Sequence, residues 1–336
     1  AAACILYLPP PCRSSGPSLK TMLSRRVLAS GSQAARTNVV SQVLGVNAAL
    51  SGVEMQTRHA ASMKAVKQRM RSVENIKKIT KAMKMVAAAK LKHDQRRMEN
   101  GLPFVKPVQA LFERLPRAEK TGPVTFLGVT SDKGLCGGVN SAVAKMSRLG
   151  MHEEEAKGNP VKFMCIGQKG TAALKRTMGD RFSLSFEEAA KLPWSFATAS
   201  LIAERVIISE PQRLKVVCNK FKSLVNYETV AQHCVTLSEA QTMDKAEWSK
   251  AMDVYSFEPS IYEVWNDLQD FYYGAVVYGA YLEAATSEQS ARMTAMDNAS
   301  KNATEMLDKL SLIYNRARQA KITTELCEII SGAAAV

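Results

Sequence analysis

The segment SDKGLCGGVN, residues 131–140, is a place where residue types and spacing could do chemistry. It follows an apolar run and precedes a helical one, which is where a phosphate-binding loop would lie. It matches neither GxGxxG nor GxxxxGK[ST], and no acidic residue is placed to hold a ribose. Cys136 has no neighbouring His or CxxC partner that would activate its thiol. The pattern therefore favours a tight strand-to-helix turn over a phosphate site.

The other potentially reactive side chains are dispersed along the chain. The seven cysteines never form CxxC or Cys/His spacing, and the four histidines are equally scattered. Free thiols in a reducing compartment are expected. No HExxH, GxSxG or paired-carboxylate arrangement occurs. We therefore expect no catalytic site, no cofactor and no metal in this chain.

The first 59 residues have the composition of a targeting segment. They contain six Lys or Arg residues and a single acid, Glu54, within a chain of net charge +14. An Arg- and Ser-bearing, acid-poor stretch is typical of a mitochondrial presequence, and a disordered basic tail is the alternative. Arg58 predicts a mature start near Ala60 or Ala61. Residues 1–21 precede Met22 and are expected to lie upstream of the true start, and no apolar run reaches the roughly 20 residues of a membrane span.

Residues 62–100 contain good helix formers and neither Gly nor Pro, which predicts one long basic helix. Its apolar positions form two sets that each keep a 3, 4, 3 spacing. The sets are Met63, Val66, Met70 and Val73, then Ile76, Ile79, Met83 and Val86. The step of three between the sets predicts a stammer, where the apolar seam shifts around the helix. Pro103 and Pro107 are expected to kink or end it.

The middle of the chain changes character. Short apolar runs at 124–131 and 161–167 predict strands, each followed by a helix, at about 138–149 and 168–178. A further helix is expected at 197–209 and a strand hairpin at 213–237. Together they predict a compact α/β domain with a mixed sheet.

Helix resumes near residue 260 and need not stop before Ser331, a length of roughly 105 Å at 1.5 Å per residue. An unbroken heptad seam is expected at Met296, Ala299, Ala303, Met306, Leu310, Ile313, Ala317 and Ala320. Two long helices separated by one domain can meet only as an antiparallel pair. The predicted fold class is therefore α/β plus a long antiparallel coiled coil.

The basic face of the first helix leaves three interpretations open. It is a solvated surface, a nucleic-acid site or a site for an acidic protein. Residues 62–100 contain no aromatic side chain on which a base could stack, which counts against nucleic acid.

Four segments together resemble the γ subunits of F-type ATP synthases. They are IKKITKAMKMVAAAKL (76–91), SDKGLCGGVN (131–140), RMTAMDNASKNATEML (292–307) and NRARQAKITTELCEIISGA (315–333). The resemblance implies a central rotor shaft. Its terminal helices would pair around an inserted Rossmann-like domain with a mixed sheet, and the implied divisions are 1–59 presequence, 60–115 first shaft helix, 120–240 α/β domain, 241–257 linker and 258–336 second shaft helix.

The resemblance also implies partners and contact residues. The shaft would turn inside a ring of α and β subunits and carry torque from the membrane c-ring with the small δ and ε subunits, one copy per complex. It would lie on the matrix side of the mitochondrial inner membrane, and catalysis would belong to β. The family's contacts with β carry over to Met83, Arg292, Arg318, Gln319, Thr323 and Glu325.

The chain's last eight residues carry no charge, which suits a terminus that turns inside a protein sleeve where a buried charge is costly. Two other function classes stay open from the residues alone. They are a basic mitochondrial RNA-binding or ribosomal scaffold, and, more remotely, a dinucleotide-dependent dehydrogenase built on residues 120–240.

Overall fold

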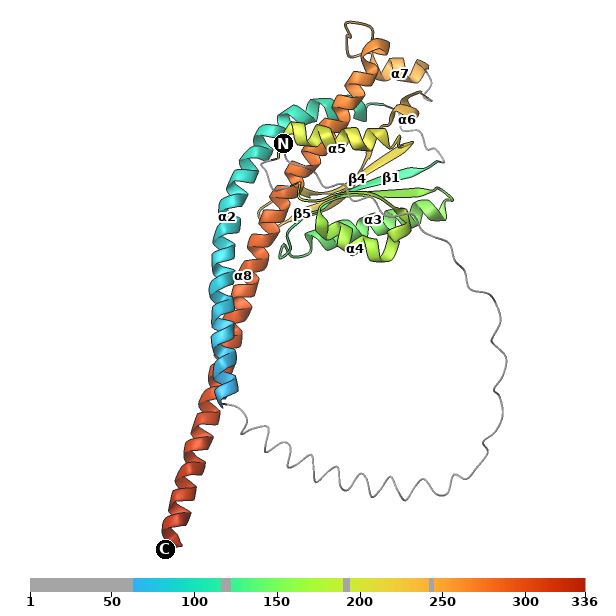
Figure 1. Ribbon diagram of the computed structural model, residues 1–336. Coiled ribbons are helices and arrows are strands. Elements are labelled where there is room, and N and C mark those ends of the chain that lie inside the picture. The colour runs from blue at the N-terminus through green and yellow to red at the C-terminus, as the bar shows by residue number, and fades with distance from the viewer. Residues whose placement is uncertain (1–62, 116–121, 190–193, 242–244, 336) are drawn as a thin grey trace, which may run out of the picture. The chain divides into compact units, whose positions relative to one another are not determined.

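The computed structural model describes residues 63–115, 122–189, 194–241 and 245–335 (Figure 1). The predicted presequence, residues 1–59, lies outside them. The described residues divide into two units. One comprises residues 80–299, and the other comprises 63–79 with 300–335. The long helices α2 (Met63–Glu113) and α8 (Ile261–Ala334) each contribute residues to both units.

The unit of residues 80–299 is built on a five-stranded mixed sheet of order β3-β2-β1-β4-β5. The strands are β1 (Val124–Val129), β2 (Val161–Ile166), β3 (Phe182–Phe186), β4 (Arg213–Phe221) and β5 (Tyr227–Cys234). Strands β3, β2, β1 and β4 pair in parallel, and β5 pairs antiparallel with β4. The expected mixed sheet and its C-terminal hairpin are confirmed.

Helices cover both faces of this sheet. Successive side chains of a strand point to opposite faces, and those of β1 are buried on both. Phe126 and Phe163 point to the face covered by α3 (Val139–Ala156) and α4 (Gln168–Met178). Leu127 and Met164 point to the other face, where they join a larger core. That core also includes residues of α5 (Phe196–Ile208), the end of α2 and the first third of α8.

Three elements were not expected from the sequence. Strand β3 lies after the short 3-10 helix Gly179–Arg181, and helices α6 (Leu237–Gln241) and α7 (Lys245–Met252) follow the hairpin. Strand β3 is half-exposed along its length at the edge of the sheet. Its FSLSF sequence therefore lacks the continuous apolar run that identifies β1 and β2.

Helices α2 and α8 pack antiparallel within the unit of residues 80–299. A Cβ atom built on Gly101 would lie 2.5 Å from Leu282 Cδ1, and one built on Gly279 would lie 2.8 Å from Val105 Cγ1. A larger residue at either position would force the facing side chain to move, so the two glycines allow this tight packing. Pro103 and Pro107 lie inside α2, which continues to Glu113, so the prolines do not end the helix. Figure 1 shows α2 curving in its C-terminal part.

The buried stripe of α2 differs from the expected stammer. Its least exposed residues continue without interruption at alternating steps of three and four. They are Met63, Val66, Met70, Val73, Lys77, Thr80, Lys84, Ala87 and Leu91. Ile76 and Ile79 are instead 49% and 57% exposed. The predicted stammer is therefore wrong, because the second apolar set lies beside an unbroken heptad stripe and is exposed at Ile76, Ile79 and Val86.

The stripe of α8 is also displaced at alternate positions. Met296, Ala303, Leu310 and Ala317 are buried or half-buried, as the expected seam requires, but Met306 and Ile313 are exposed. Leu307 and Tyr314 take the intervening places. Positions i+3 and i+4 are both neighbours of i on a helix. Spacing alone therefore could not distinguish the two sets.

Candidate functional site

The glycine-rich turn of residues 131–140 is held by its own side chains. Asn140 Oδ1 accepts a hydrogen bond from the Ser131 backbone N at 3.0 Å, and Asn140 Nδ2 donates to Ser131 Oγ at 2.8 Å. The same amide lies 3.2 Å from the Sγ atom of Cys136, which is 2% exposed. Leu135 adopts the left-handed conformation with φ of 64° and is 61% exposed. The turn is thus a self-supporting loop whose thiol is buried.

The described cysteines have no arrangement that would activate them. Burial raises the pKa of Cys165 to about 11 and the pKa of Cys218 and Cys234 to about 12, so these thiols stay protonated. Cys327 is exposed. Among the described residues no group of three or more His, Cys, Asp or Glu side chains could hold a metal ion. No helix in the same part of the chain is long and apolar enough to cross a membrane.

A cleft of about 830 Å³ lies where the loops after the parallel strands face α2 and α8. Its lining mixes both signs of charge, including Lys90, Arg97, Asp132, Glu187 and Glu188. Trp194 and Tyr281 also line it, and their rings stack with centroids 3.6 Å apart. Balanced charge of this kind does not define one class of ligand.

Arg292, one of the predicted contact residues, lies at the edge of this cleft and is 9% exposed. Its guanidinium forms a close ion pair with Glu288 and donates to Gln289 Oε1 at 2.9 Å. It also donates to the Gly134 carbonyl at 3.3 Å, which joins α8 to the glycine-rich turn. Burial raises the pKa of Glu288, although Arg292 opposes this effect. Arg292 is therefore engaged with groups of its own chain.

Met83 lies beside the buried stripe of α2 and is half-buried. Its neighbours on the exposed apolar stripe, Ile79 and Val86, are both 57% exposed. This stripe runs next to the lysines that surround it on α2, including Lys81 and Lys90. Exposed apolar side chains that are surrounded by lysines suit a protein partner whose binding surface has an acidic rim.

The four remaining predicted residues lie together on α8, in the unit of residues 63–79 and 300–335. Arg318, Gln319, Thr323 and Glu325 are all exposed, as is every residue from Arg318 to Ala335. Their recorded bonds are local to the helix. Thr323 Oγ1 donates to the Gln319 carbonyl at 2.9 Å, and Lys321 lies 3.4 Å from Glu325.

Large apolar side chains share this exposed end of α8. Ile322, Leu326, Ile329 and Ile330 are between 55% and 69% exposed. Contiguous exposed apolar surface on a soluble protein marks a protein interaction site. The end of α8 therefore combines outward-facing polar groups with an apolar surface that the rest of the described chain does not cover.

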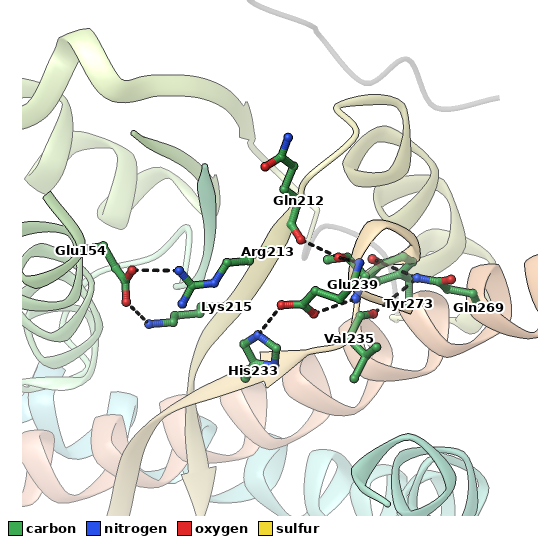
Figure 2. A network of polar contacts seen from close by, with 10 residues as sticks. Glu154, Gln212, Arg213, Lys215, His233, Val235, Glu239, Gln269 and Tyr273 are labelled. Carbon is green, nitrogen blue, oxygen red and sulfur yellow. Dashed lines mark hydrogen bonds and ion pairs between the residues drawn. The ribbon is translucent and has the colours of Figure 1, made fainter. Parts of the chain in front are cut away.

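The sequence did not indicate a buried charge network at the start of β4, where the carboxylate of Glu154 lies. Figure 2 shows the Glu154 carboxylate facing Arg213 and Lys215, with Lys215 Nζ 2.8 Å and Arg213 Nη1 3.2 Å away. Burial would raise the pKa of Glu154, but hydrogen bonds from Lys215 and Asn159 and the nearby positive charges lower it to about 2. No local pattern reveals this network, because Glu154 lies in the run HEEEA, where its neighbour Glu153 is exposed.

A second network in Figure 2 fixes the junction between β5 and α6. The backbone N of Thr236 donates to Glu239 Oε2 at 3.1 Å, and the backbone N of Glu239 donates to Thr236 Oγ1 at 3.2 Å. This reciprocal pairing is a capping box, and it is readable in the sequence TLSE. His233 Nε2 lies 3.1 Å from the same carboxylate. Both networks stabilise the domain and neither offers a reacting group.

Comparisons with known proteins identify the family of this chain. A family model described as ATP synthase matches residues 62–336. The mitochondrial ATP synthase F(1) complex subunit gamma of Rattus norvegicus is 40% identical over 283 residues, covering 82% of this chain and 100% of that protein. These names do not support the RNA-binding alternative.

Solved structures show the same relationship. A chain of the Tetrahymena thermophila mitochondrial ATP synthase central stalk and c-ring matches with a TM-score of 0.55 and 30% identity, covering 66% of this chain and 99% of that one. A Euglena gracilis ATP synthase chain matches with a TM-score of 0.70, 82% and 95% coverage and 20% identity, which shows the shared fold. Family model and relatives agree that this chain belongs to the γ subunits of F-type ATP synthases.

Proposed function

We propose that this chain is the rotor subunit that carries torque between the membrane c-ring and the catalytic ring of α and β subunits. The observation that carries the proposal is the end of α8, where every residue from Arg318 to Ala335 is exposed and no other described part of the chain covers four large aliphatic side chains. A helix end of this composition needs a surrounding protein. A catalytic ring with a central opening would supply that cover.

The finer architecture belongs to the same proposal. Helices α2 and α8 pair as an antiparallel coiled coil, and the domain of residues 120–240 is Rossmann-like. The alternating steps of the α2 stripe support the pairing. The strand order with β1 between β2 and β4 supports the second assignment. Residues 60–115 and 258–336 then form the shaft, 241–257 connects it to the domain, and 1–59 is the presequence.

Contacts with the catalytic subunits are assigned to Met83, Arg318, Gln319, Thr323 and Glu325. The exposed apolar stripe beside Met83 supports the first contact, and the outward polar groups of α8 support the others. Arg292 belongs to the same set by family resemblance. Because its guanidinium is buried and bonded within the chain, we propose that it acts by holding α8 against the glycine-rich turn.

The chain acts without a catalytic site of its own, and ATP chemistry belongs to the β subunits. Its remaining partners are the small δ and ε subunits, with one copy of the chain per complex. It lies on the matrix side of the mitochondrial inner membrane and meets the membrane only through the c-ring. The mitochondrial names of its relatives support this location.

Replacement of the γ chain in a host that lacks its own tests the proposal. Native gel electrophoresis with mass spectrometry should find the chain in a complex with α and β subunits, and vesicles should pump protons when given ATP. A chain that migrates apart from α and β, or one that is retained on RNA in a salt-sensitive manner, would contradict it.

A further inference from the structure

The part of the crevice that lies over the carboxyl ends of β1 and β4, beside the larger cleft, is filled by α8. Strand β1 pairs with β2 on one side and with β4 on the other, and such a switch point is where open α/β sheets bind their ligands. Between Val129, Asn219 and Tyr281 the remaining void is about 10 Å³. That volume holds one water molecule at most. Side chains of α8 therefore occupy the position that a ligand takes in related architectures.

Three donors on α8 bond to the α/β domain at this crevice. Ser287 Oγ donates to the Asn219 carbonyl at 3.3 Å, and Ser290 Oγ donates to the Leu224 carbonyl at 2.5 Å. Arg292 donates to the Gly134 carbonyl at 3.3 Å. The acceptors belong to β4, the β4–β5 turn and the β1–α3 loop. We call Ser287, Ser290 and Arg292 the α8 clamp.

The α8 clamp is shielded from water and its acceptors are braced. Ser287 is fully buried and Ser290 is 3% exposed. Asn219, also fully buried, donates through Nδ2 to the Val139 carbonyl at 3.3 Å and accepts from Thr229 Oγ1 at 2.6 Å. Asn219 thereby ties β4 to α3 and to β5, so a force on its carbonyl is shared by these three elements.

Directional bonds add to the resistance that the packed apolar core offers to rotation of α8. Side chains of α8 such as Tyr273, Val277 and Tyr281 pack against the sheet in that core. Hydrophobic burial depends on area and not on direction, so hydrogen bonds supply the directional part of the contact. Hydrogen bonds weaken steeply when their geometry changes. Three of them, made to β4, to the β4–β5 turn and to the β1–α3 loop, fix the angular position of α8.

We propose that the α8 clamp locks the rotation of α8 to the α/β domain, so that Ser287, Ser290 and Arg292 are positioning residues for torque transfer. The inference rests on the proposed rotor function. It identifies the residues through which torque passes between α8 and the α/β domain. Loss of the clamp lets α8 turn without the domain. ATP hydrolysis then continues while proton movement falls behind.

The test compares variants in the assembled, membrane-bound complex. The clamp variant combines Ser287→Ala, Ser290→Ala and Arg292→Gln with Glu288→Gln, which avoids a buried unpaired carboxylate. The matched control is Thr286→Val. Thr286 is fully buried on the same helix, but its hydroxyl donates to the Leu282 carbonyl of α8 itself at 2.9 Å. The Thr286→Val substitution therefore removes a buried hydrogen bond but leaves the three bonds of the α8 clamp in place.

Protons pumped per ATP hydrolysed is the readout, because a purely stabilising role would lower both activities together. We expect the clamp variant to lower this ratio at least about threefold through loss of hydrogen bonds that resist slip. The Thr286→Val control should keep the wild-type ratio. A clamp variant that carries Arg292→Lys instead of Arg292→Gln should recover part of the lost ratio. Should the clamp variant fail to assemble, Ser287→Ala and Ser290→Ala are measured singly and should lower the ratio to a smaller extent.

An unchanged ratio in the clamp variant, or in both single serine variants, overturns the clamp. A lowered ratio in Thr286→Val equal to that of Ser287→Ala overturns it as well. Failure of the proposed function looks different, since the wild-type chain itself would then give no ATP-driven pumping.

Discussion

The Nζ atom of Lys84 lies 2.6 Å from Oδ1 of Asp297, and this ion pair joins α2 to α8 across 213 residues of sequence. Lys84 occupies a position of the buried stripe of α2 where a coiled coil usually places an apolar residue. Both side chains keep partial exposure, at 43% and 31%. The pair therefore specifies register more than it contributes to stability.

Replacement of Lys84 should consequently have a small effect on stability. We expect Lys84→Met to change the free energy of unfolding by less than about 1 kcal/mol, because partly exposed ion pairs are worth little and Met fills the same stripe. Thermal unfolding of the purified chain at low and high salt measures this. A loss several times larger that persists in high salt would show that the pair is a main stabilising contact.

Met83→Lys should reduce coupling between hydrolysis and pumping. The new cation would bond to the acidic rim that suits a partner at this surface of α2. A hydrogen bond to a charged group is worth about 1.5–3 kcal/mol, and each turn must then break it. Protons pumped per ATP in vesicles should fall at least about twofold. Met85→Lys is the matched control, because Met85 is 62% exposed and lies on another face of α2. Equal pumping ratios in the two variants would count against the contact.

Two parts of the end of α8 should respond differently to substitution. Arg318 and Gln319 form bonds to the partner, whereas residues 332–336 only turn against it. Deletion of residues 332–336 should leave assembly and most ATP turnover intact, since these residues offer only small apolar surface and no directional bond. Arg318→Ala and Gln319→Ala should each slow ATP turnover at least about fivefold through a lost bond to a charged partner. Ala334→Glu should be worse than the deletion, because it places a charge in a closed sleeve.

Turnover assays and growth on a respiratory substrate decide between these four variants. If the deletion is the most damaging, the tail grips its surroundings and does not merely turn against them.

Cys327 offers a direct probe of where the end of α8 lies. Its side chain is exposed in the chain itself, whereas Cys136, Cys165, Cys218 and Cys234 are buried. A maleimide should therefore label Cys327 rapidly in the isolated chain and much more slowly in the assembled complex. Peptide mass spectrometry identifies the labelled position. Equal labelling rates in the two states would show that no partner covers this part of α8.

Glu154→Gln should destabilise the α/β domain in a pH-dependent way. The folded-state pKa of Glu154 is about 2 against a usual value of 4.5, so its contribution is present above pH 4.5 and is lost as the pH falls toward 2. The contribution at neutral pH is on the order of 3 kcal/mol. Urea unfolding of wild type and variant should therefore differ at pH 7 and converge near pH 2. Glu153→Gln, an exposed neighbour on α3, should differ little from wild type at any pH.

Much of the fold and part of the candidate site could be predicted from the sequence because they depend on local patterns. Continuous apolar runs identify β1 and β2, and helix formers without interruption identify most of α2. The great length of α8 was also predictable, and the structure ends it at Ala334. The half-exposed β3 carries no such pattern and was not expected. Exposed family residues such as Gln319 and Thr323 could be proposed as contacts from motif position alone.

The tertiary structure decided which of several possible patterns is used. On α2, Lys77 and Thr80 enter the buried stripe while Ile76 and Ile79 stay exposed, against the ranking by hydrophobicity. Sequence places both sets at helical spacing, and only a partner surface far away in the chain selects one of them. For Arg292, motif position predicts a contact with β, and the structure adds a bond to the Gly134 carbonyl that no local pattern indicates. Local sequence thus determines what a helix can present, and long-range packing determines which of its faces is buried, because burial depends on neighbours that local sequence does not contain.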